Sequence, residues 1–368
     1  MTIPESLTSL PPEPIVRAIA AGDGWLAFDE FMALALYAPG FGYYARASAK
    51  FGRMPEAGGG SDFVTAPELS ALFGQTLSTQ VAQALQVTQT REVWEFGAGS
   101  GALALQLLQA LDQLNQPLAC YHIVDLSGSL LARQRLTLAH YGQRVQWHAQ
   151  LPAQMTGVVL GNEVLDAMPV KLLVRLGGLW HERGVAGGEA GLIWRDRPTA
   201  LRPPLDVEGD HDYLTEIHPQ GEAFVRTLAE RLTNGAVFLI DYGFPEHEYY
   251  HPQRLMGTLM CHRAHLADTD ALTDVGQKDI TAHVNFTGIA LAAQDAGLGV
   301  LGYATQGRFL INCGLAARLE SASVAERVMA QRLMTEHEMG ELFKVIGLHT
   351  AAPWDAVGFA QGDRTHTL

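Results

Sequence analysis

Apolar positions follow a helical period near the N-terminus and, from residue 91 onward, alternate between short runs and helical stretches. Residues 15–37 carry apolar side chains near helical spacing, and Pro39-Gly40 is expected to end that helix. The later runs predict strands over 92–96, 120–124, 145–148, 158–160 and 236–240, and helices over 102–114, 129–141 and 221–233. Such an alternation is typical of a parallel sheet with helices on both faces.

A further helix is expected between these two regions, over residues 65–85. Thr65 and Glu68 have the spacing of a capping box, and Pro67 is tolerated in a first helical turn. From the local pattern alone, helix capping is the simplest interpretation of both Asp62 and Thr65.

Two more segments complete the expected architecture. Residues 171–234 read as β-like runs with Gly and Pro turns and then a helix, and we interpret them as an insertion over the substrate side of the sheet. Towards the C-terminus we expect a strand over 279–286, a helix to 296, paired strands at 300–303 and 309–313, and a helix over 316–337. The predicted division is an N-terminal helical cap region 1–90, a core of 91–170 and 235–368, and the insertion 171–234.

Composition limits the partners of the chain. The 368 residues are 48% hydrophobic and carry a net charge of -14. Nucleic-acid binding needs clustered Lys and Arg, which the sequence lacks, so no nucleic-acid partner is expected. Cys120, Cys261 and Cys313 show no CxxC spacing and predict neither disulfides nor a zinc ribbon. Because no targeting pattern or long apolar span occurs, we expect a cytoplasmic protein without membrane insertion.

A glycine-rich turn, Gly97-Ala98-Gly99-Ser100-Gly101, joins the strand at 92–96 to the next helix. Glycines allow a sharp turn and close approach of a ligand, which the N–H groups of the first helical turn then face. The turn fits two templates, the dinucleotide turn of nicotinamide enzymes and the acidic-residue turn of S-adenosylmethionine-dependent methyltransferases, for which Glu95 supplies the acid. Asp125 follows the next strand, where related folds place an acid on ribose hydroxyls. The sequence therefore predicts a nucleoside cofactor site.

Carboxylates also follow the strand at 158–160, in the segment that runs from Asn162 to Pro169. Ligands of open α/β sheets bind at the carboxyl ends of strands. Glu163 and Asp166 are three residues apart, so a single helical turn would place both on one side.

His247-Glu248-Tyr249-Tyr250-His251 matches the HExxH motif of zinc proteases in its letters. That motif requires a continuous helix, and Pro245 and Pro252 flank it closely. We therefore expect no metal site there.

Several motifs together resemble the MidA-like family of S-adenosylmethionine-dependent protein arginine methyltransferases, whose mitochondrial members assist respiratory complex I assembly. The matching stretches are Gly40 to Tyr44, Asp62 to Gly74, Glu95 to Ala104, Asn162 to Pro169, Asp241 to Gly243, Gly257 to Leu259, Gly276 to Phe286 and Met339 to Gly347. Two positions depart from the family pattern, since Asp125 stands in place of Glu and Asn285 in place of Asp.

The resemblance implies a Rossmann-like α/β fold with the seven-stranded sheet of class I methyltransferases, whose last strand is antiparallel. It also implies an S-adenosylmethionine site formed by Glu95, Gly97, Gly99, Gly101 and Asp125, together with Asp62 and Thr65. Asn162, Glu163 and Asp166 are implied to lie beside the transferred methyl group and the acceptor, an arginine of a protein partner.

Other functions stay open at this stage. A cofactor-binding assembly factor with little turnover would need the same glycine turn, and a nicotinamide-dependent oxidoreductase is the less favoured enzyme class. The acceptor protein is open, with a respiratory complex I subunit as one candidate. The oligomeric state is open too, with a homodimer as one candidate.

Overall fold

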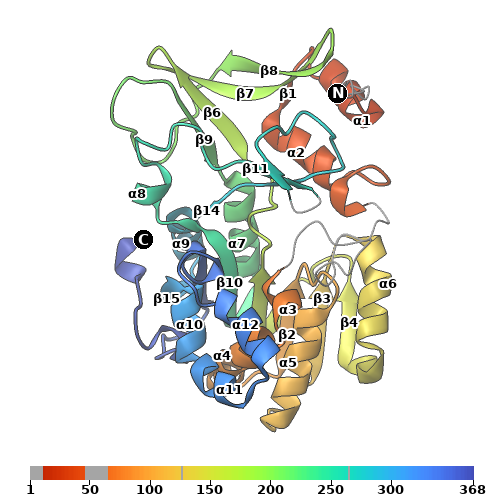
Figure 1. The fold of residues 1–368 in the computed structure, drawn as a ribbon, viewed down its shortest axis with the longest axis vertical. Helices are drawn as coiled ribbons and strands as arrows, with labels where there is room; N and C mark the ends of the chain where they lie inside the picture. Colours follow the sequence, from red (N-terminus) through yellow and green to blue (C-terminus); the bar gives the residue numbers. More distant parts are fainter. Residues whose placement is uncertain (1–10, 46–64, 126, 264–265) are drawn as a thin grey trace. The chain divides into compact units, whose positions relative to one another are not determined.

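The computed structural model describes residues 11–45, 65–125, 127–263 and 266–368, which form two compact units (Figure 1). We name one of them the core unit; it contains the described residues within Ala47–Asp166, Gly221–Tyr249 and His283–Leu368. The accessory unit contains those within Met1–Arg46, Ala167–Gln220 and Tyr250–Ala282. Asp62, one of the expected cofactor ligands, lies outside the described residues.

An eight-stranded mixed sheet forms the centre of the core unit. Seven strands follow the order β15-β16-β10-β5-β2-β3-β4, and the short β14 pairs with β10. Their bounds are β2 Glu92–Phe96, β3 Cys120–Val124, β4 Val145–His148, β5 Met155–Asn162, β10 Leu232–Phe244, β14 Val284–Asn285, β15 Gly299–Thr305 and β16 Phe343–His349. Neighbours from β4 to β10 are parallel, whereas β16 is antiparallel to both β10 and β15.

An α/β fold is thus confirmed, although the sheet has one strand more than the seven expected. The additional strand forms because β10 continues to Phe244, where Gly243 and Phe244 pair with Val284 and Asn285. The expected strand over 279–286 is accordingly divided into β13 (Asp279–Thr281) and β14.

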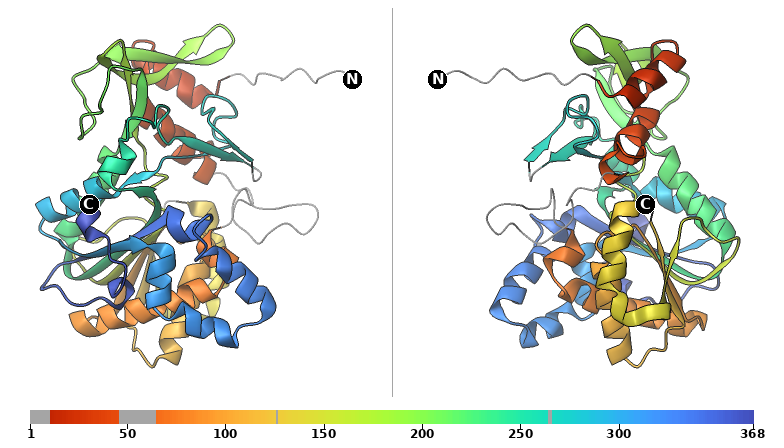
Figure 2. Two further views of the ribbon diagram at one scale, coloured as in Figure 1. Left: turned by 60° about the vertical axis from the view of Figure 1, so that its left-hand side comes forward. Right: turned by 90° about the vertical axis from the view of Figure 1, so that its right-hand side faces the viewer.

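Helices cover both faces of the core sheet (Figures 1 and 2). They are α3 Ala66–Leu69, α4 Leu72–Thr88, α5 Ala102–Gln113, α6 Gly128–Thr137, α7 Pro219–Arg231, α8 Glu246–Tyr249, α9 Phe286–Asp295, α10 Gln306–Asn312, α11 Leu315–Ser321, α12 Val324–Arg332 and α13 Met339–Leu342. Short 3-10 helices span Ala139–Arg144, Val357–Phe359 and Thr365–Thr367. The apolar faces of α4 and α5 are buried through residues such as Leu77, Val81 and Leu107, which join one hydrophobic core with the sheet.

The accessory unit combines two small antiparallel sheets with two helices. One sheet has the order β1-β7-β6-β9 with β8 paired to β7, and the other has the order β12-β11-β13. Bounds are α1 Glu13–Ala21, β1 Leu26–Ala27, α2 Phe28–Tyr37, a 3-10 helix Tyr43–Ala45, β6 Lys171–Leu176, β7 Leu179–Gly188, β8 Gly191–Pro198, β9 Tyr213–Ile217, β11 Met260–Arg263, β12 Leu266–Asp268 and β13 Asp279–Thr281.

Three of the stretches that carry the family resemblance contribute hydrogen bonds to this accessory unit. The fully buried Glu216 accepts hydrogen bonds from the backbone N–H groups of Thr258 (2.9 Å) and Leu259 (3.1 Å), beside the left-handed Gly257. The hydroxyl of Tyr44 donates to the carboxylate of Asp279 at 2.9 to 3.0 Å. These contacts give all three stretches a structural role.

The two units divide the chain differently from the expected segments. Residues 66–88 belong to the core unit rather than to an N-terminal cap, because Gln106 of α5 accepts from Gly74 N (3.0 Å) and donates to Pro67 O (2.7 Å). Most of α7 also belongs to the core unit rather than to the insertion, since its Phe224 ring lies 5.0 Å from Phe96 of β2.

Three local predictions were wrong in ways that capping and glycine positions explain. The expected helix over 15–37 is interrupted at Asp23 and Gly24, which both have positive φ (54° and 78°). Residues 309–312 lie in helix α10 and Cys313 is its C-cap, while Thr305 caps the start of the helix by accepting from Arg308 N at 3.3 Å. The expected helix over 316–337 is divided at Ser323, which starts α12 with a capping box to Glu326.

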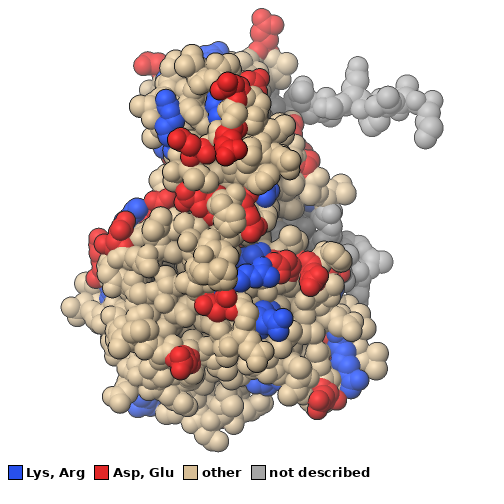
Figure 3. Space-filling view, turned by 90° about the vertical axis from the view of Figure 1, so that its left-hand side faces the viewer, with Lys and Arg blue, Asp and Glu red and all other residues tan. Residues whose placement is uncertain are grey.

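The charges on the described surface are mixed. On the face drawn in Figure 3, Asp and Glu side chains lie among the Lys and Arg side chains. Among the described residues, no helix combines the length and apolar character needed to cross a membrane.

Candidate cofactor and acceptor site

The predicted glycine turn lies between β2 and α5, at the carboxyl end of the parallel strands. Gly97, Gly99 and Gly101 have φ values of 63°, 53° and 83°, in the left-handed region that side chains other than glycine adopt only with strain. Gly97 N donates to Val124 O at 3.0 Å, which joins the turn to the end of β3. The predicted turn is therefore present, and its conformation explains why each of the three positions carries glycine.

Asp125 lies directly after β3, beside this turn. Its Oδ1 accepts from Ser127 N at 2.8 Å and its Oδ2 from Gln134 Nε2 at 2.7 Å. Gln134 Nε2 also donates to Gly99 O at 3.0 Å, so the acid and the glycine turn share one partner. The structure therefore brings together Asp125 and the glycines as the sequence predicted.

Glu95 is buried one residue before the end of β2, with 3% of its surface exposed. Tyr121 on the neighbouring strand donates its hydroxyl to Glu95 Oε2 at 2.6 Å. Burial raises the pKa of Glu95 from 4.5 to about 7, while the Tyr121 hydrogen bond lowers it and the charge of Asp125 raises it. Glu95 therefore titrates near neutral pH.

Thr65 precedes α3, but the expected capping box is not formed. The Thr65 side chain makes no capping hydrogen bond to α3. Glu68 instead accepts a hydrogen bond from the hydroxyl of Ser100, inside the glycine turn. The capping box does not form because the Glu68 carboxylate is hydrogen-bonded to Ser100, a residue distant in sequence. This contact places α3 beside the glycine turn.

The second predicted cluster is a turn after β5 that surrounds the carboxylate of Asp241. Asp241 Oδ2 accepts from the backbone N–H groups of Val164 (3.1 Å), Leu165 (2.9 Å) and Asp166 (3.2 Å), and its Oδ1 accepts from Tyr242 N (2.9 Å). No helical turn forms among these described residues, contrary to the expected geometry for Glu163 and Asp166. The backbone follows the buried carboxylate instead, and Glu163 has a left-handed φ of 54°.

The three polar side chains of this turn are each held by a neighbour. Asn162 Nδ2 donates to Glu163 Oε1 at 3.1 Å, and the Tyr242 hydroxyl donates to Asp166 Oδ2 at 2.6 Å. Burial raises the pKa of Asp241, as do the charges of Asp166 and Glu163, while the backbone donors lower it. Asn162, Glu163 and Asp166 thus form one polar cluster at the end of β5.

The two turns are adjacent. A Cβ atom added to Gly97 would lie 3.2 Å from Val164 Cγ2, in the turn after β5. The predicted cofactor residues and the predicted acceptor residues therefore meet at the same edge of the core sheet.

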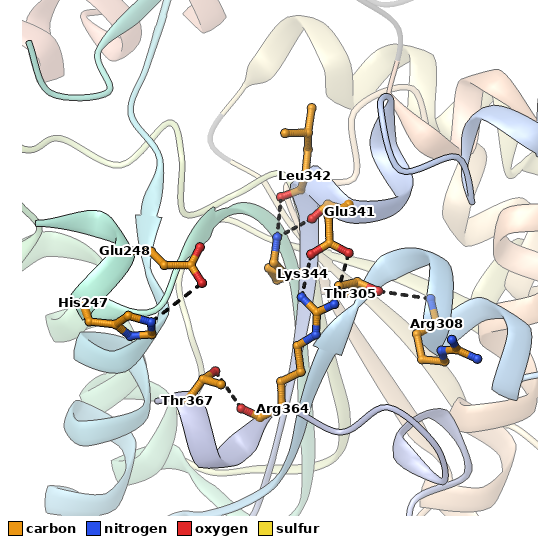
Figure 4. A network of polar contacts seen from close by, with 9 residues as sticks. All are labelled: His247, Glu248, Thr305, Arg308, Glu341, Leu342, Lys344, Arg364 and Thr367. Atoms are coloured by element: carbon orange, nitrogen blue, oxygen red, sulfur yellow. Dashed lines mark hydrogen bonds and ion pairs between the residues drawn. The ribbon is translucent and has the colours of Figure 1, made fainter. Parts of the chain in front are cut away.

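The stretch from Met339 to Gly347 forms a separate polar network beside the end of β10 (Figure 4). Arg364 donates to both carboxylate oxygens of Glu341, at 2.5 and 3.3 Å, and the buried Lys344 donates to the backbone oxygens of Glu341 and Leu342. Lys344 pairs with Asp241 in the β10–β16 register. This network fixes β16 next to the strand that carries Asp241.

The HExxH letters do not lie on one helix. Helix α8 ends at Tyr249, before His251. His247 Nε2 lies 3.9 Å from Glu248 Oε1, and Figure 4 shows the two side chains next to each other. Asn285, where the family pattern has Asp, caps α9 by accepting from Gly288 N at 3.2 Å. An Asp oxygen would accept the same bond, so the departure preserves the cap.

Sequence reasoning missed three residues that organise the site. Tyr121 and Gln134 occupy ordinary strand and helix positions, and no local pattern distinguishes them. Asp241 belonged to a matching stretch, but its partners are 75 to 77 residues away in sequence. Only the register of β10 beside β5 brings them together.

Comparisons with known proteins agree with this geometry. Residues 76–304 match the family model of S-adenosyl-L-methionine-dependent methyltransferases. A Burkholderia thailandensis protein crystallised with bound S-adenosyl-homocysteine is 48% identical, with a TM-score of 0.91 over 96% of this chain and 95% of that chain. The mitochondrial protein arginine methyltransferase NDUFAF7 of Homo sapiens is 26% identical over 88% of this chain and 80% of its own length. The Caenorhabditis elegans homolog is also 26% identical, over 88% and 83%.

The described residues suit the cofactor that these relatives indicate. Three left-handed glycines at a helix N-terminus leave room for a nucleoside close to the backbone, and the Asp125 carboxylate lies beside them, joined through Gln134. The family model matches more than half of the chain, and the crystallised relative is similar over nearly all of it. The chain therefore belongs to the family of S-adenosylmethionine-dependent methyltransferases.

Proposed function

We propose that the chain methylates an arginine side chain of a protein partner. The observation that carries the proposal is the turn after β5, where Asn162, Glu163 and Asp166 form a polar cluster next to the glycine turn. The names of the NDUFAF7 relatives, which cover most of the chain, support arginine as the acceptor.

When bound, S-adenosylmethionine supplies a methyl group on a positively charged sulfur. We assign its binding to Glu95, Gly97, Gly99, Gly101, Asp125 and Thr65, and to Asp62 outside the described residues. Glu95 in its ionised form suits the ammonium of the cofactor's amino-acid end, and Asp125 suits the ribose hydroxyls.

The acceptor guanidinium is planar and protonated, and a carboxylate can accept two of its N–H bonds at once. Glu163 is assigned this role, because Asn162 fixes one of its oxygens and the strained backbone holds it at the end of β5. Asp166, held by Tyr242, adds a second negative charge that steadies the guanidinium while a proton leaves. Correct positioning of the acceptor contributes at most roughly 7–11 kcal/mol to lowering the barrier.

The test combines an acceptor search with one substitution. Labelled S-adenosylmethionine is added with the protein to lysate from a strain that lacks it, and labelled bands are analysed by mass spectrometry. We expect methylarginine in a protein band with the wild type. With Glu163→Gln we expect no label but nearly unchanged binding of S-adenosylhomocysteine. Label on another residue type would contradict an arginine acceptor, and equal loss of binding and transfer would contradict the role of Glu163.

Absence of any labelled product would instead favour an assembly factor with little turnover. A respiratory complex I subunit as the acceptor, a cytoplasmic location and a homodimer stay predictions. A calorimetric titration with S-adenosylhomocysteine and a nicotinamide cofactor separates this enzyme from an oxidoreductase.

A further inference from the structure

We infer that Gln134 is a positioning residue for the cofactor, because its side-chain amide joins the glycine turn to Asp125. Gln134 lies on α6 and is fully buried, although glutamine is usually exposed in folded proteins. Its side-chain amide forms hydrogen bonds with the glycine turn, with Asp125 and with Trp147 of β4. The inference rests on the cofactor placement proposed above.

The orientation of the amide follows from its third partner. Trp147 on β4 donates its indole N–H to Gln134 Oε1 at 3.2 Å. An indole N–H can only donate, so the carbonyl oxygen of Gln134 must face Trp147. Both amide hydrogens then point towards Gly99 O (3.0 Å) and Asp125 Oδ2 (2.7 Å).

This arrangement controls two parts of the cofactor site at once. The bond to Asp125 Oδ2, together with the Ser127 N–H on Oδ1, sets the plane of the carboxylate. The bond to Gly99 O fixes a peptide whose glycine has no side chain to restrain it. One buried side chain of α6 therefore joins three other segments, namely the turn between β2 and α5, the end of β3, and β4.

A double-mutant cycle tests whether Gln134 acts through Asp125. Binding of S-adenosylhomocysteine is measured by calorimetry for the wild type, Gln134→Leu, Asp125→Asn and the double variant. A hydrogen bond to a carboxylate supports an expected loss of affinity of about tenfold for Gln134→Leu. The loss in the double variant should be smaller than the sum of the two single losses, because each single substitution already weakens the contact that Gln134 and Asp125 share.

Thr137→Val is the matched control, since the Thr137 hydroxyl donates its one hydrogen to Ser100 O (3.0 Å) in the same turn and not to Asp125. Its loss should add to that of Asp125→Asn. Trp147→Phe should weaken binding less than Gln134→Leu, because the amide is then free to turn over. Gln134→Glu, similar in volume but without the amide hydrogens, serves if the leucine variant does not fold.

These measurements distinguish a failure of the positioning role of Gln134 from a failure of the proposed cofactor site. Unchanged affinity for Asp125→Asn would overturn the placement of Asp125 and the role of Gln134 with it. Weakened binding for Asp125→Asn, with either no loss for Gln134→Leu or fully additive losses, would overturn the role of Gln134 alone.

Discussion

The two turns at the edge of the core sheet reach left-handed backbone conformations by different means. The turn after β2 uses three glycines, whereas the turn after β5 places a glutamate at φ 54°. The first conformation is intrinsic to glycine, and the second is imposed by Asp241, whose carboxylate binds three successive N–H groups of the turn. The glycine turn is therefore encoded locally, while the acceptor turn depends on the tertiary structure.

The largest effect is expected from removing the residue that imposes the second turn. Asp241→Ala leaves four backbone N–H groups, two of them in buried residues, without their acceptor, and we expect a loss of about 3–5 kcal/mol in the free energy of unfolding. Urea denaturation followed by circular dichroism measures it. Asp241→Asn, which retains one acceptor oxygen, should lose less.

Asp210→Ala is the control for this measurement, since Asp210 is exposed in a loop and should change stability by less than about 0.5 kcal/mol. A similarly small loss for Asp241→Ala would show that the acceptor turn does not depend on that carboxylate.

A medium effect is expected where the two turns touch. Gly97→Ala forces a side chain into a left-handed conformation, at a cost of about 1–2 kcal/mol, and brings a Cβ to 3.2 Å from Val164 Cγ2. We expect about tenfold weaker binding of S-adenosylhomocysteine by calorimetry, because the added strain opposes the turn conformation that holds the ligand.

Adding Val164→Ala to Gly97→Ala removes the close contact with Val164 Cγ2 and should recover part of the lost affinity. The affinity that is not recovered then reports the backbone strain alone. Gly187→Ala is the matched control, because no atom lies within 4 Å of its added Cβ and its φ is not left-handed. Undiminished binding by Gly97→Ala would mean that the turn does not need its glycine.

The same contrast explains how much the sequence could predict. The glycine turn, Asp125 and the alternating strands were predicted because each depends on residues close in sequence. The capping box at Thr65 failed since Glu68 is bonded by Ser100, 32 residues away. The strand expected at 309–313 failed because a short apolar run suits either a strand or a buried helix. The role of Gln134 was missed because its helix position does not reveal its partners, and that of Asp241 was missed because it depends on the register of β10 beside β5.

The smallest effect, and one opposite in sign, is expected at Glu163. Glu163→Gly relieves the left-handed strain, partly offset by the greater freedom of glycine when unfolded, so we expect a gain of up to about 1 kcal/mol in unfolding free energy. Methyl transfer should be lost in the same variant. Gln89→Gly is the matched control, because exposed Gln89 has the same φ of 54° at the end of α4 and should gain similar stability with full activity. If Glu163→Gly retained transfer, the strained glutamate would have no functional reason to persist. A gain in stability with loss of transfer would mean that the fold tolerates this strain because the acceptor needs a carboxylate there.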